Sequence, residues 1–200
     1  DFESYRPGAI KRGPNRYAEH PEAEILCRAV AKDNGAPLLW TKPRHRRPDP
    51  RAVQMLHEMV ASGEKIVAHN ALFEFALLNH LFHRDTGVLW PRDAVHLRSR
   101  MVCTAVMARR AGFPSKLEKV AEALELKHRK DPKGRAAIRT LCVPQKDGRR
   151  ILPAEDPATF DTLCHYCVQD VRVEQEIHRK LEYFTPTGAH LEAYWFDILL

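Results

Sequence analysis

The pattern of hydrophobic and polar positions predicts a β-hairpin early in the chain. Residues 24–32 have the alternation of a strand, and an Asp-Asn-Gly turn at 33–35 leads into the apolar residues 38–40. Two such segments joined by a tight turn are typical of a hairpin. The residues Asp1-Phe2-Glu3 resemble the end of a further strand, and we expect its apolar start to precede Asp1.

Apolar residues at helical spacing predict helices over much of the remaining chain. Asp49-Pro50 and Asn70 are expected to begin two of them, with a short strand at 65–68 in between. A third helix is expected at 104–110, a fourth behind the capping-box sequence Ser115-Lys116-Leu117-Glu118, and a long one from 157 to 181. This order of strands and helices predicts an α/β fold with a mixed sheet.

Length and composition are those of a globular domain. The chain has 200 residues, of which 44% are hydrophobic and 29% charged. No apolar segment approaches the roughly 18 residues of a membrane span, so we expect no membrane association. Five cysteines at irregular spacing predict reduced thiols in a cytoplasmic setting, and the single C-x-x-C at 164–167 is interpreted as core packing.

The positive charge is concentrated in one segment. The whole chain carries a net charge of +6, whereas residues 127–150 hold nine basic and two acidic side chains, so the remainder sums to −1. Two glycines and weak periodicity predict that much of this segment is loop. It either binds a polyanion such as nucleic acid or is a solvated loop, and the same two alternatives hold for a second basic cluster at 42–47.

Acidic residues occupy positions that the apolar pattern assigns to the core. Asp1 and Glu3 point to the same face of a strand, Glu74 lies on the apolar stripe of its helix, and Asp170 lies on that of the last helix, one turn after Tyr166. Each acid alone is also compatible with a solvated edge position. Converging buried carboxylates predict divalent cations such as Mg²⁺ or Mn²⁺, and two such ions about 3.5–4 Å apart hydrolyse phosphodiesters.

These acids form an ordered set of three motifs: Asp1-x-Glu3, Asn70-x-x-Phe73-Glu74 and Tyr166-x-x-x-Asp170. The set resembles the exonuclease motifs of the DEDDy 3′→5′ exonucleases, which have a ribonuclease H-like fold. Over nearly the whole chain the pattern is most similar to the proofreading domain of phage-type family A DNA polymerases. Glu74 stands where the family usually has aspartate, a variant that is familiar in the phage-type branch.

The resemblance implies a role for each motif residue. Asp1 would bridge two Mg²⁺ or Mn²⁺ ions, Glu3 and Asp170 would complete the site of the first ion, and Glu74 would hold the second. Tyr166 would orient the attacking water. The product would be a nucleoside 5′-monophosphate released from a DNA 3′ end.

Further residues are candidates for binding a single-stranded DNA 3′ end or primer terminus. Phe73 either stacks on the terminal base or packs beneath its helix. Asn70 is most simply an expected helix N-cap, and any contact with substrate would be additional. His69 is either a phosphate contact or a structural residue. Phosphate contacts are also expected from three basic side chains: Lys130, Lys133 and Arg135.

The resemblance also implies a domain division. Residues 1–188 are expected to form the exonuclease domain, and 189–200 to begin a helix leading to a polymerase domain of the same longer chain. Two other functions remain open. One is a ribonuclease D-like exonuclease acting on RNA 3′ ends, and the other is a non-catalytic nucleic-acid-binding module with a decayed site.

Overall fold

The protein has a mixed α/β architecture in which helices cover two small groups of strands. The computed structural model describes residues 1–8, 13–82, 84, 100–128 and 132–197. In chain order the elements are β1 (Phe2–Tyr5), α1 (Pro14–Ala18), β2 (Glu24–Val30), β3 (Leu38–Thr41), α2 (Pro50–Ala61), β4 (Ile66–Ala68), α3 (Ala71–His80), β5 (Met101–Cys103), α6 (Thr104–Arg110), α7 (Leu117–Ala123), α8 (Pro132–Leu141), α9 (Pro157–Leu181), the 3₁₀-helix η1 (Glu182–Phe184) and α10 (Gly188–Asp197).

The strands form two hydrogen-bonded ladders of different polarity. β1, β2 and β3 pair in that order as an antiparallel sheet, which confirms the expected hairpin, while β4 and β5 pair in parallel. Both polarities of the expected mixed sheet are present, but no hydrogen bonds join the two ladders within the described residues. The first strand also continues to Tyr5, two residues beyond its expected end at Glu3, because Ser4 and Tyr5 still pair with β2.

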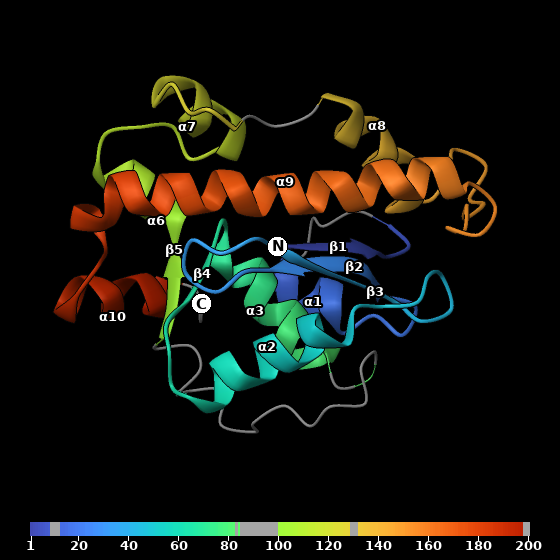
Figure 1. Ribbon diagram of the computed structural model, residues 1–200, viewed down its shortest axis with the longest axis horizontal. Coiled ribbons are helices and arrows are strands. Elements are labelled where there is room, and N and C mark those ends of the chain that lie inside the picture. The colour runs from blue at the N-terminus through green and yellow to red at the C-terminus, as the bar shows by residue number, and fades with distance from the viewer. Residues whose placement is uncertain (9–12, 83, 85–99, 129–131, 198–200) are drawn as a thin grey trace.

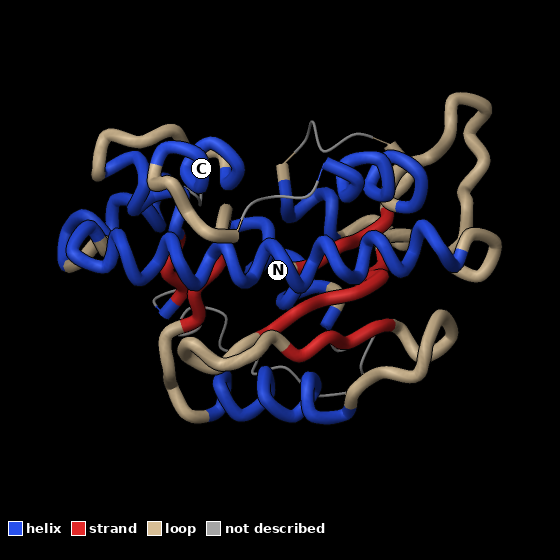
Figure 2. Tube along the Cα trace, turned by 45° about the horizontal axis from the view of Figure 1, so that its top comes forward, coloured by secondary structure: helices blue, strands red, loops and turns tan. Residues whose placement is uncertain are grey.

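The long helix α9 crosses both ladders. Figure 1 shows it running along β1 and β2 and nearly perpendicular to β5, with α7 and α8 beside it, and Figure 2 shows it passing in front of both strand groups. It has the bounds expected from the sequence, as does α6. The Asp156 carboxylate accepts a hydrogen bond of 3.0 Å from the Thr159 N–H, which satisfies one of the free donors at the start of the helix.

Apolar side chains pack against both faces of the antiparallel sheet. On one face, Leu26 and Cys27 of β2 contact α8 and α9 through residues such as Leu141 and Leu163. The other face packs on α1, α2 and α3, and Ile25 of β2 belongs to that second cluster. Burial on both faces explains why the residues of β2 are predominantly apolar.

A β-bulge lies directly beside Glu3. Glu3 pairs with Cys27 and Ser4 pairs with Ile25, so Leu26 is the extra residue of β2. The adjacent residues Leu26 and Cys27 consequently both pack in the core toward α9. Because a bulge bends its strand and redirects nearby side chains, this one helps to set how Glu3 faces α9.

Within residues 127–150, much of which the sequence predicts to be loop, Pro132–Leu141 form helix α8, which the prediction did not include. Its buried face consists of the small or apolar residues Gly134, Ala137 and Leu141, while Lys133 and Arg139 are exposed. The many charges on the outer face obscured this sparse stripe, and packing against α9 stabilises a helix that the local sequence only weakly favours.

Two of the three expected helix caps differ from the prediction. The Asp49 side chain accepts from the Arg51 N–H, which confirms that cap. Asn70 stands at the N-cap position of α3, but its backbone is left-handed with φ 62° and its side chain makes no capping hydrogen bond. The capping box at Ser115 is also absent, because Lys116 is the N-cap of α7 and makes no side-chain cap bond.

None of the helices in the described ranges is long and apolar enough to cross a membrane. All five cysteines are free and buried. Cys164 and Cys167 of the C-x-x-C pack in the core between α9 and β2, which agrees with their interpretation as core residues.

A buried carboxylate at the start of β2 connects three segments of the chain. Glu24 accepts from Lys42 Nζ at 3.1 Å and also pairs with Arg44 and Arg150, and His45 Nε2 lies 3.6 Å from it. Burial alone would raise the pKa of Glu24, but the hydrogen bonds from His45, Arg150 and Arg44 outweigh it and hold the pKa well below the usual range.

We predict that Glu24→Gln destabilises the fold in a pH-dependent way. At pH 7 its free energy of unfolding should fall by about 1–3 kcal/mol, because buried and partly buried donors lose a charged acceptor. Since the folded pKa is lowered, the advantage of the wild type is fully present above the usual value of 4.5 and is lost as the pH falls through the folded pKa. Urea denaturation at pH 7, 5 and 3 measures how far the two stabilities converge.

The matched control is Glu22→Gln, at an exposed position. Its free energy of unfolding should follow that of the wild type at every pH. A constant gap between Glu24→Gln and the wild type down to pH 3 would contradict the electrostatic origin.

Candidate active site

Three carboxylates converge where α9 passes β1. Oxygen atoms of Asp1, Glu3 and Asp170 all lie within 4.8 Å of one another. Glu3 is only 8% exposed and Asp170 only 3%. The strand supplies two acids on one face because side chains alternate along it, and the helix supplies the third from its inward stripe.

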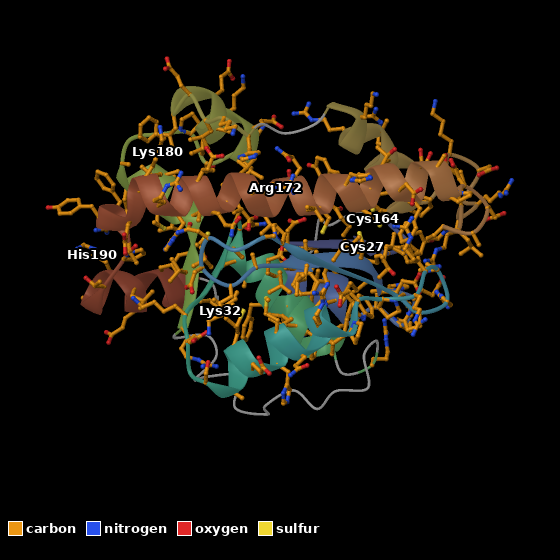
Figure 3. The ribbon with its side chains drawn as sticks, viewed as in Figure 1. Cys27, Lys32, Cys164, Arg172, Lys180 and His190 are labelled. Carbon is orange, nitrogen blue, oxygen red and sulfur yellow. The ribbon has the colours of Figure 1, made fainter. Side chains whose placement is uncertain are left out.

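Backbone and thiol contacts hold the two strand acids in place. Asp1 exchanges two hydrogen bonds with Ala29 of β2, its nitrogen donating at 3.2 Å and its carbonyl accepting at 3.0 Å. The Cys167 thiol of α9 donates to the Asp1 carbonyl at 3.5 Å, and the Cys142 thiol lies 4.0 Å from the Glu3 carboxylate. In Figure 3, Cys27 and Cys164 lie side by side where β2 and α9 meet. The start of β1 is therefore fixed directly against α9.

The arrangement of these acids fits a divalent cation. Like charges buried this close to one another disfavour the ionised state unless a cation compensates them. Carboxylate oxygens are the ligands that Mg²⁺ and Mn²⁺ prefer. Asp1, Glu3 and Asp170 are the residues that would hold such an ion.

Glu74 lies beside this cluster but is not part of it. Its carboxylate accepts a hydrogen bond from the Phe2 N–H and neighbours the carboxylate of Glu174. Burial raises the pKa of Glu74 to about 8, and the neighbouring carboxylate of Glu174 adds to the rise. The structure thus brings three of the four expected metal ligands together, and the role of Glu74 at a second ion stays a prediction.

Glu174 is a buried acid that the sequence analysis did not select. It lies on α9 one turn after Asp170 and is 4% exposed. With Asp1 and Glu74 it lines a cavity of about 610 Å³ between the two ladders, a cavity that neither Glu3 nor Asp170 lines. The sequence could have identified Glu174, because it lies four residues after Asp170 and so falls on the same stripe of the helix.

Tyr166 lies one turn before Asp170, as its spacing predicts. It is 2% exposed, and helix α8 covers its ring, since a Cβ atom placed on Gly134 would overlap that ring. The ring of Tyr166 is therefore positioned by two helices, α9 and α8.

The three candidate substrate residues near β4 have different surroundings. His69 donates from Nε2 to the Ser115 carbonyl at 2.7 Å, which in the neutral ring leaves Nδ1 to accept from the Thr104 hydroxyl at 2.9 Å. Both ring nitrogens are thus occupied within the protein, which favours the structural alternative. Phe73 is half-buried and its ring centroid lies 5.2 Å from that of Tyr17, so packing accounts for part of its surface. Asn70 is exposed.

The basic candidates lie on and before α8. Lys130 falls outside the described residues. Lys133 and Arg135 are exposed on the outer face of α8, and Arg135 forms an ion pair with Glu118 of α7. A phosphate contact from Arg135 would therefore compete with that pair.

Comparisons with known proteins agree with this architecture. A family model described as the RNase_H superfamily matches residues 29–182, which include Glu74, Tyr166 and Asp170. Over 194 residues the chain is 32% identical to a DNA polymerase of Bacillus phage SP02, covering 94% of this chain and 28% of the polymerase. The chain thus spans less than a third of that relative's length, and no solved structure matches it. From the family match over most of its length, this chain belongs to the RNase_H superfamily.

Proposed function

We propose that this protein is a metal-dependent 3′→5′ exonuclease that removes nucleoside 5′-monophosphates from DNA 3′ ends. The observation that carries the proposal is the convergence of Asp1, Glu3 and Asp170, whose carboxylate oxygens lie within 4.8 Å of one another. Membership of the RNase_H superfamily and similarity to a phage DNA polymerase support it. Two divalent ions, Mg²⁺ or Mn²⁺, are the proposed cofactors.

The chain's own residues would perform the positioning in this reaction. Asp1, Glu3 and Asp170 would hold the cation from two segments that pack against each other, so the ligands would need little reorganisation. When bound, such an ion lowers the pKa of a water molecule and stabilises charge on the phosphate. Tyr166, one turn before Asp170, orients the attacking water. Glu74 accepts from the Phe2 N–H and so fixes the beginning of β1 beside Asp1.

The proposed substrate is single-stranded DNA or a primer terminus. Exposed basic side chains of α8, among them Lys133, would contact phosphates, which makes binding dependent on salt. We further propose that a polymerase domain of the same longer chain delivers the primer, because the phage relative is itself a DNA polymerase and this chain matches only 28% of it. This proofreading would take place in the cytoplasm of a bacterium or of a phage-infected host.

With Mg²⁺ or Mn²⁺ the protein should shorten a 5′-labelled single strand of DNA stepwise from its 3′ end. The double variant Asp1→Ala, Glu3→Ala should lose at least about 10³-fold of this rate, because the ion loses two of its three clustered ligands. Tyr166→Phe should lose on the order of 10²-fold while still binding metal, because only the orientation of water is affected. Denaturing gels give the rates, and chromatography identifies the released nucleotide.

Asp161→Ala is the matched control, since Asp161 is an exposed acid on the same helix and lies away from the cluster. It should retain the wild-type rate. Equal and negligible release by the wild type and the double variant would favour a non-catalytic binding module. A much faster rate on an RNA strand of the same sequence would instead favour a ribonuclease D-like activity.

Divalent metal should stabilise the protein through Asp170. At about a hundredfold excess over Kd, Mn²⁺ should add about 2.7 kcal/mol to the free energy of unfolding, because it binds the folded state. Asp170→Asn should lose most of this gain, and Asp161→Asn should keep it. Thermal unfolding with Mn²⁺ and with a chelator measures the difference, and an equal rise in Tm for all three proteins would place the ion elsewhere.

A further inference from the structure

Helix α8 contacts Tyr166 at a position where only glycine fits. Gly134 is buried, and a Cβ atom built on it would overlap ring atoms Cγ, Cδ2 and Cε2 of Tyr166, the farthest of them at 2.5 Å. Real Cβ atoms do not approach other heavy atoms this closely. The backbone of α8 therefore lies directly against the ring.

The presence of a glycine here needs an explanation, because glycine is among the poorest helix formers. Gly134 lies inside the first turn of α8, and its φ is not in the left-handed range. It thus serves no turn or cap that demands glycine. Contact with the Tyr166 ring is the requirement that the structure shows.

The rest of α8 is anchored so that this contact is maintained. Ala137 and Leu141, on the same face as Gly134, pack in one cluster with Leu163 and Cys167 of α9. The ion pair between Arg135 and Glu118 connects α8 to α7, which also contacts α9. The ring of Tyr166 is held by α9, to which it belongs, and by a second helix that is itself fixed.

We propose that Gly134 is a positioning residue for Tyr166, and that α8 holds the tyrosine in the orientation that hydrolysis requires. This inference rests on the proposed exonuclease function. The outer face of the same helix carries the basic side chains Lys133 and Arg139. In the proposed function, helix α8 would therefore contact DNA phosphates on one side and set the orientation of Tyr166 on the other.

A double-mutant cycle of Gly134→Ala and Tyr166→Phe tests this role. Gly134→Ala should lower kcat on the order of 10²-fold, as expected for a misplacement of about 1 Å, and leave KM within about twofold. In the Tyr166→Phe background the same substitution should lower kcat no further, because the hydroxyl that it misplaces is already gone. A purely structural effect would lower the rate by the same factor in both backgrounds. That result, or an unchanged kcat in Gly134→Ala, would overturn the proposal.

Ala136→Gly is the matched control, because Ala136 is exposed on the same helix and the change also involves one methyl group. It should lower Tm through the poorer helix propensity of glycine and leave kcat unchanged. An inactive wild type would refute the proposed function itself, whereas an active wild type with an active Gly134→Ala would refute only this inference.

A second pair of variants keeps the proposal testable if Gly134→Ala alone does not fold. With the ring removed by Tyr166→Ala, the added methyl group has space, so Gly134→Ala should then raise Tm. If it lowers Tm in that background too, the contact with Tyr166 is not what requires glycine, and the proposal falls.

Discussion

The packing of α9 across the antiparallel sheet is the contact on which the rest of the molecule depends. Leu163, Cys167 and Val171 on its inner stripe are buried against β2 and α8, and this apolar burial supplies free energy of roughly 25 cal/mol per Å². The same helix places Asp170 beside Asp1 and Glu3. The same contact forms part of the hydrophobic core and brings the acidic cluster together.

In that arrangement hydrophobic packing stabilises the fold, whereas repulsion among the buried carboxylates destabilises it. Five carboxylates, those of Asp1, Glu3, Glu74, Asp170 and Glu174, lie in or beside the cluster, and four of them are at most 8% exposed. The raised pKa of Glu74 reflects burial first and its neighbour Glu174 next. A fold that buries so many acids together is destabilised locally, and a bound cation relieves that repulsion. Glu24, at the start of β2, is also buried, and its cationic partners hold its pKa well below the usual range.

Helix α8 connects the basic segment to this site. The basic side chains of this segment suggest contact with a polyanion. The opposite face of α8 packs on α9 and contacts the ring of Tyr166. One short helix thus presents cations outward while it restrains an aromatic ring inward. In the proposed function, substrate binding and the orientation of Tyr166 would therefore depend on the same element.

The sequence by itself determined the hairpin, most of the longer helices and the direction of their side chains, but not helix α8 or strand β5. The alternation along β1 placed Asp1 and Glu3 on one face, and helical periodicity gave α9 its bounds together with Tyr166 one turn before Asp170. Only the tertiary structure decided which of these side chains meet. It set Glu74 beside Phe2 and Glu174 instead of inside the cluster, occupied both ring nitrogens of His69, and placed Gly134 against Tyr166. Local periodicity orients a side chain relative to its own element, whereas distances between elements follow from packing among residues far apart in the chain.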